Sequence, residues 1–140
     1  MPFKRISGPD GHVEPRTISS ITVAEGDALM FDYENEVVIL ATSAMTPERF
    51  AGVADEAATT ADTSVKVRLP SEDDRYIADT TSNSATTDNY HRLALTDEDE
   101  VANGADDTTD TGVFMQLGVV GATTDKKIMG YFLARQDRAA

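Results

Sequence analysis

The chain has 140 residues and a formal net charge of −13, and it contains no cysteine and no tryptophan. This length fits one domain of ordinary size, and the lack of cysteine excludes disulfide scaffolds, thiolate metal sites and cysteine nucleophiles. No stretch approaches the roughly 18 apolar residues of a membrane helix, and the first residues lack the apolar run of a secretory signal. We therefore expect a protein that stays soluble where it is made.

Acidic residues are concentrated in the body of the chain. Residues 17–125 contain 22 acidic and 5 basic side chains, whereas residues 1–16 carry a net charge of +1 and residues 126–140 a net charge of +3. Such a body is repelled by phosphate backbones and by anionic lipid, so we expect neither nucleic acid nor membrane as a partner. Solubility alone, or adaptation to high salt, would also explain the acidic composition.

The first sixteen residues differ in composition from the rest. They include four residues that disfavour regular structure, Gly8, Pro9, Gly11 and Pro15. The sequence therefore predicts an N-terminal arm at 1–16 with weak intrinsic order, followed by a domain at 17–134 and a C-terminal tail at 135–140. The arm combines apolar and basic side chains, which suit strand addition to the sheet edge of a partner. The candidate partner-binding residues are Phe3, Lys4, Arg5 and Ile6.

From residue 17 onward the apolar pattern favours strands over helices. After Ile18, Ile21 and Val23 comes a turn at 25–27, and extended runs are then predicted at 28–33 and 36–41, joined by a hairpin turn. Only 46–50 offers a helical start, with Thr46 as cap and Pro47 in the first turn. We expect one helical turn there at most.

The second half continues the same pattern. Residues 64–69 alternate with a period of two, which places Val65, Val67 and Leu69 on one face. Further strands are predicted at 50–54, 75–79, 90–95, 112–120 and 127–133. Segments rich in Ala, Thr, Asp and Ser, at 54–64, 79–89 and 102–111, are interpreted as loops or hairpin tips. Short strands separated by turn-rich segments predict an all-β sandwich or small barrel.

Common catalytic and cofactor motifs are absent from the sequence. No phosphate-binding glycine loop, dinucleotide-binding turn, zinc-protease helix or serine nucleophile elbow occurs, and the only histidines are His12 and His91. Nothing marks a catalytic triad on His91. Paired carboxylates can cleave glycosides, but the aromatic platforms that grip sugar rings are scarce. We therefore expect no enzyme activity and no cofactor.

An acidic segment in the second half could supply oxygen ligands for Ca²⁺. Its carboxylates are Asp97, Glu98, Asp99, Glu100, Asp106, Asp107 and Asp110. If Asp97 is the first position of a 12-residue EF-hand loop, Ala102 occupies the sixth, where glycine is required. The EF-hand reading therefore fails, and a looser calcium-binding loop or a solvated acidic loop remains.

The order of elements between residues 17 and 133 resembles a known family. Val23-Ala24-Glu25-Gly26-Asp27-Ala28-Leu29 is similar to the opening of a small barrel, and Phe50-Ala51-Gly52-Val53-Ala54 follows the hairpin. After the long loops come the strand at 114–120 and the closing strand at 128–133. This layout resembles the capsid decoration proteins of tailed bacteriophages and related viruses, also called head-stabilising or cement proteins. The resemblance implies a small β-barrel or β-tulip domain, with an N-terminal arm that contacts the shell and without enzyme activity or cofactor.

The resemblance also implies partners and a location. The major capsid protein would be the partner, the protein would be a homotrimer, and it would sit on the capsid exterior after synthesis in the host cytoplasm. Only 29 of the 140 residues are Leu, Ile, Val or Phe, and a trimer interface would complete the burial of such a thin core. The alternatives are a tail- or surface-associated adhesion module that binds a glycan or receptor through its loops, and an enzyme without a familiar motif.

Overall fold

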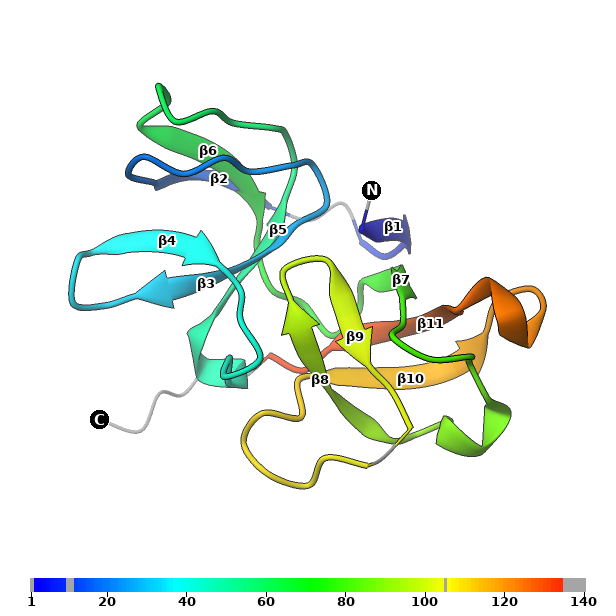
Figure 1. The fold of residues 1–140 in the computed structure, drawn as a ribbon. Coiled ribbons are helices and arrows are strands. Elements are labelled where there is room, and N and C mark those ends of the chain that lie inside the picture. The colour runs from blue at the N-terminus through cyan, green and yellow to red at the C-terminus, as the bar shows by residue number, and fades with distance from the viewer. Residues whose placement is uncertain (1, 10–11, 105, 135–140) are drawn as a thin grey trace.

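Strands make up nearly all the regular structure of this protein. The structure is a computed structural model, and it describes residues 2–9, 12–104 and 106–134. Within these ranges the chain forms eleven β-strands and three short 3-10 turns, and it contains no α-helix (Figure 1). The prediction of an all-β fold is confirmed.

The strands form two antiparallel sheets. The six-stranded sheet has the order β1 (Phe3–Ser7), β7 (Arg75–Asp79), β11 (Lys127–Phe132), β10 (Phe114–Val119), β8 (Arg92–Asp97) and β9 (Glu100–Ala102). The five-stranded sheet has the order β2 (Val13–Thr17), β6 (Ser64–Arg68), β5 (Phe50–Ala54), β3 (Ala28–Asp32) and β4 (Val37–Leu40). In Figure 1 the five-stranded sheet occupies the upper left and most of the six-stranded sheet the lower right.

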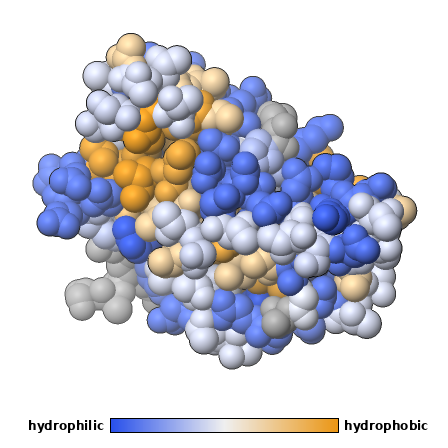
Figure 2. Space-filling view, in the orientation of Figure 1, coloured by the Kyte–Doolittle hydropathy of each residue, from blue (hydrophilic) through white to orange (hydrophobic). Residues whose placement is uncertain are grey.

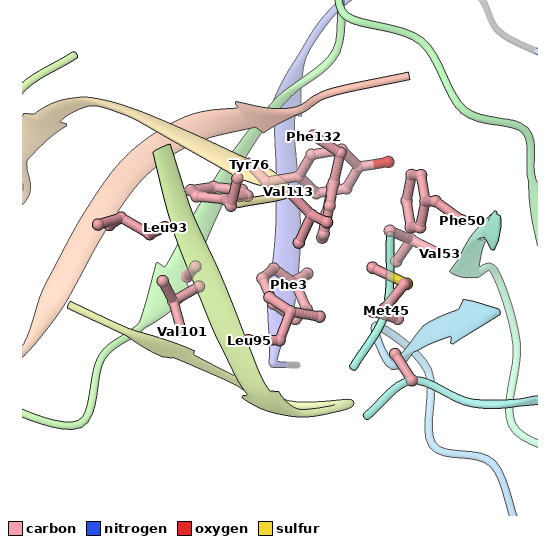
Figure 3. Close-up of a cluster of buried hydrophobic side chains, with 14 of the residues drawn as sticks. Phe3, Met45, Phe50, Val53, Tyr76, Leu93, Leu95, Val101, Val113 and Phe132 are labelled. Atoms are coloured by element: carbon pink, nitrogen blue, oxygen red, sulfur yellow. The ribbon is translucent and has the colours of Figure 1, made fainter. Parts of the chain in front are cut away.

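Aromatic side chains pack between the two sheets. The ring of Phe132 has its centroid 4.9 Å from that of Phe3, 4.3 Å from that of Phe50 and 5.1 Å from that of Phe114. Phe50 belongs to the five-stranded sheet and the other three to the six-stranded sheet, so their contact joins the sheets (Figure 3). Burial of one such side chain contributes about 1.5–3 kcal/mol, so this cluster stabilises the packing of the two sheets against each other.

The five-stranded sheet curls around a second apolar cluster. Leu29, Val38, Val65 and Val67 lie inside the curve, and the loop residue Val23 packs against them. The curl brings parts of the edge strands β2 and β4 within 8 Å of each other between Cα atoms, but no ladder of hydrogen bonds joins them. This sheet is therefore strongly curved and is not a closed barrel.

The N-terminal residues do not form an arm. β1 pairs with β7, β2 pairs with β6 along its whole length, and Phe3 is 1% exposed in the core. The expected boundary between an arm at 1–16 and a domain at 17–134 is therefore wrong for the residues that the structure describes. Gly8 and Pro9 lie in the connection between strands of different sheets, and Pro15 is tolerated because β2 is an edge strand. The tail expected at 135–140 lies outside the described residues.

Most other predicted elements are present. Eight predicted strands appear with their bounds shifted by at most two residues, and the helical start at 46–50 is one 3-10 turn, Pro47–Arg49. The Thr46 side chain makes no cap hydrogen bond there. The run that contains Ile18, Ile21 and Val23 is not a strand, since only Val23 forms an isolated bridge, with Ala58. The short strand β9 was not predicted.

Candidate functional site

A groove lies on the five-stranded sheet where its two edges approach each other. Two cavities, of about 470 and 360 Å³, share the side chains of Arg16, Phe31 and Tyr33. The larger cavity extends to the turn Pro47–Arg49 and to Leu69, and the smaller one is lined by residues of β2, β3 and β4. We call the combined space the edge groove. Figure 2 shows hydrophobic side chains gathered between β2 and β6 on one side and β3 and β4 on the other.

Phe31 and Tyr33 form the aromatic part of the edge groove. Phe31 lies on β3 and Tyr33 directly follows its last residue, so the alternation of the strand directs both to one side. Their rings stack, with centroids 5.5 Å apart and an interplanar angle of 21°. The Phe31 carbonyl accepts two hydrogen bonds from Arg49, at 3.2 and 2.9 Å, and the Tyr33 hydroxyl donates one to the Glu48 carbonyl at 2.9 Å. The 3-10 turn therefore holds the aromatic pair in place.

The rim of the edge groove is acidic apart from one arginine. The acidic residues that line the cavities are Asp32, Glu36 and Glu48. Hydrogen bonds from Asn35 hold the pKa of Asp32 below its ordinary value, so Asp32 is ionised at neutral pH. The Arg16 guanidinium lies 3.0 Å from Glu14, but its buried Nε has no hydrogen-bond partner. The edge groove therefore has an apolar floor and a rim that is mainly negative.

Two unpaired strand edges flank the groove. In the described part of the chain, β2 and β4 each pair with only one other strand. Pro15 and Arg16 lie on the β2 edge, and a proline or a charged side chain discourages the addition of a further strand. β4 reads Val37-Val38-Ile39-Leu40, without charge or proline. Where β2 does not already lie within 8 Å of it, its outward backbone groups can pair with an added strand.

The four predicted partner-binding residues do not belong to this groove. They lie on β1, where alternation separates them: Phe3 is buried and Arg5 is 3.0 Å from the buried Asp74, whereas Lys4 is exposed and Ile6 is 46% exposed. Phe3 cannot anchor a partner from the core, so the set does not form one binding site. The residues of the edge groove were not predicted from the sequence. The alternation of Phe31 and Tyr33 around Asp32 is visible in the sequence, but the approach of the two sheet edges is not.

The histidines are not part of a catalytic triad in the described residues. His91 Nδ1 lies 3.5 Å from Asp88 Oδ1 without hydrogen-bond geometry, and no serine hydroxyl is bonded to His91. His12 lies exposed just before β2. The described ranges also contain no group of three or more His, Asp or Glu side chains that could hold a metal ion. The described part of the acidic segment at 97–110 therefore shows no such cluster of carboxylates.

The acidic turn between β8 and β9 lies where the two sheets meet. The Glu98 carbonyl accepts a hydrogen bond from the Ala28 amide of the five-stranded sheet at 2.9 Å. Hydrogen bonding to Asp97, with burial and the Asp97 charge, raises the pKa of Asp99 to about 7. Burial also raises the pKa of Asp27, and the negative charges of Glu98 and Asp97 in this turn raise it further. The turn therefore concentrates like charges at a junction of the fold.

Comparisons with known proteins return no family. No protein-family model and no curated protein sequence matches this chain. In the part of the chain that the structure describes, no helix is long and apolar enough to cross a membrane.

Proposed function

We propose that this protein is a capsid decoration protein, a structural protein that binds the outer surface of a viral capsid as a trimer and stabilises it without catalysis. The edge groove is the observation that carries this proposal. An apolar floor between two open strand edges suits a protein segment, since backbone hydrogen bonds supply affinity and alternate side chains enter the groove. The curled five-stranded sheet, open at β2 and β4, is compatible with the β-tulip type of domain.

The partner would be an extended segment of the major capsid protein. It would pair with the β4 edge and place apolar side chains against Phe31 and Tyr33. Basic residues flanking that segment would face Asp32 and Glu36 on the rim. Such a contact replaces the arm mechanism suggested by the sequence, because β1 is committed to the fold of the protein itself.

Co-sedimentation with empty shells of the major capsid protein from the same genome tests the proposal. Tyr33→Ala should weaken attachment at least about tenfold, as expected for an aromatic at the centre of an interface. Tyr90→Ala is the matched control, because Tyr90 is 74% exposed and lines neither cavity of the groove. Failure of the wild-type protein to sediment with the shells would refute the function. Equal binding by Tyr33→Ala would refute the groove as the contact.

One observation favours the alternative of a glycan- or receptor-binding adhesion module. Tyr90 ends the loop after β7 and is the most exposed of the large hydrophobic residues that the structure describes. An exposed aromatic ring can stack on a sugar, and the sequence suggested no such ring in the loops. Binding on a glycan array that Tyr90→Ala abolishes, together with absence from shells, would support this alternative.

A further inference from the structure

We propose that the outer face of the six-stranded sheet binds the acidic surface of a second copy of this chain. This inference rests on the proposed function, whose trimer it supplies with an interface. The face consists of outward side chains on β1, β7, β11 and β10. We call it the basic sheet face, and its residues are Lys4, Arg75, Ile77, Asp79, Met115, Lys127, Met129 and Tyr131.

Strand register makes these residues neighbours. Ile77 lies opposite both Lys4 and Met129, and Met115 lies opposite both Tyr131 and Arg92. The residues that alternate with them, such as Phe3, Tyr76 and Phe132, point into the core and are buried. The basic sheet face is therefore continuous over β1, β7, β11 and β10. At β8 the loop at 106–112 packs against the sheet, where Arg92 donates hydrogen bonds to the Thr109 and Gly112 carbonyls.

The charge of this face is opposite to that of the protein. Three basic residues, Lys4, Arg75 and Lys127, share it with Asp79, which pairs with Lys127 at 2.6 Å. The chain as a whole has a net charge of −13. Arg92 on β8 does not add to the face, because it is engaged by the loop that carries Asp106 and Asp107. Acidic surface elsewhere on a second copy is therefore its electrostatic complement.

This complementarity selects the kind of symmetry. A two-fold interface centred on the basic sheet face would place it against itself, with like charges opposed. A head-to-tail contact places it against a different, acidic surface of the next copy, and such contacts form a ring where the rotation between copies closes and an open filament where it does not. A ring of three is the assembly proposed above.

The apolar side chains of the face add contact that does not depend on charge. Ile77, Met115, Met129 and Tyr131 are half-buried in the single chain, and flexible methionines adapt well to a partner surface. A cavity of about 260 Å³ lies between Pro2, Lys4, Ile77, Asp79 and Lys127. Lys4 has no ion pair with the described residues, so it can receive a carboxylate of the neighbouring copy in this cavity.

Sedimentation of the whole protein over a range of concentrations tests the inference. Lys4→Glu should weaken self-association about fivefold at low salt, with a smaller effect at about 0.5 M salt, where charges are screened. Met129→Ala should weaken it at both salt concentrations. Lys66→Glu is the matched control, because Lys66 is exposed on β6 of the other sheet and undergoes the same charge reversal. Thermal melts of each variant should show that the fold is retained.

Two outcomes would overturn the inference: a wild-type protein that stays monomeric at every concentration, or unchanged association of both Lys4→Glu and Met129→Ala. The shell-binding experiment is independent of these. A protein that sediments with shells as a monomer would overturn this inference and the proposed trimer but not the binding to shells. One that forms trimers but does not bind shells would overturn only the proposed function.

Discussion

Replacement of Phe3 by alanine tests whether the first strand belongs to the fold. The Phe3 side chain is 1% exposed, and its ring lies 4.9 Å from Phe132 and 5.9 Å from Phe114 between centroids. Removal of a fully buried phenylalanine costs about 3–5 kcal/mol, because apolar contact is lost and a cavity remains. At roughly 3 °C per kcal/mol for a chain of this size, Phe3→Ala should lower the melting midpoint by about 10 °C or more.

The matched control is Ile6→Ala on the same strand. Ile6 is 46% exposed, so its truncation removes little buried surface and should cost less than about 1 kcal/mol. Both variants are melted by circular dichroism at two protein concentrations, because self-association also stabilises the fold. If the melting midpoint of Phe3→Ala lies within roughly 2 °C of that of the wild-type protein, β1 contributes little to the stability of the fold. The hypothesis of an independent N-terminal arm would then regain support.

Three further predictions concern single positions. Tyr90 is 74% exposed and has φ of 68°, a left-handed conformation that glycine adopts more easily, so Tyr90→Gly should raise the free energy of unfolding by about 0.5–1 kcal/mol in a denaturant titration. Gly52 has φ of 130°, and a Cβ there would lie 2.1 Å from the Arg68 carbonyl oxygen, so Gly52→Ala should destabilise by at least about 2 kcal/mol in the same titration. The folded-state pKa of Asp99, about 7, lies above its ordinary value of 3.8, so its protonation stabilises the fold and this contribution is lost as pH rises from about 4 to about 7. Asp99→Asn should therefore flatten stability against pH in that window, and a carboxyl titration by nuclear magnetic resonance with a midpoint near 4 would contradict the reasoning.

Much of the fold could be read from residue patterns because it depends on local chemistry. Residues 64–68 alternate between apolar and polar, and β6 has the matching pattern of buried Val65 and Val67 between exposed neighbours. The β3–β4 hairpin follows from two β-rich runs around Glu34-Asn35. In these segments the burial of alternate side chains and the turn chemistry agree.

The remaining elements depend on pairing that a local pattern cannot show. β1 and β2 carry glycine, proline and charge nearby, and their strand conformation is stabilised by β7 and β6 from distant parts of the sequence. Short β9 pairs only with β8. The edge groove has the same origin, because Arg16 meets Phe31 and Tyr33 only after the sheet has curled. In these segments tertiary packing, and not the β-propensity of the local sequence, determines the structure.

The structure of β1 determines how binding can be separated from folding. Phe3 faces the core and Lys4 faces outward on the basic sheet face, so one short strand serves both stability and the proposed copy–copy contact. Deletion of residues 2–6 would remove both together, and a loss of binding after that deletion would not identify a contact. Exposed point substitutions, Lys4→Glu on one sheet and Tyr33→Ala beside the other, leave the buried side chains in place. If these two variants keep the wild-type melting temperature but lose different interactions, the molecule has two separate docking surfaces, one for its own copies and one for the shell.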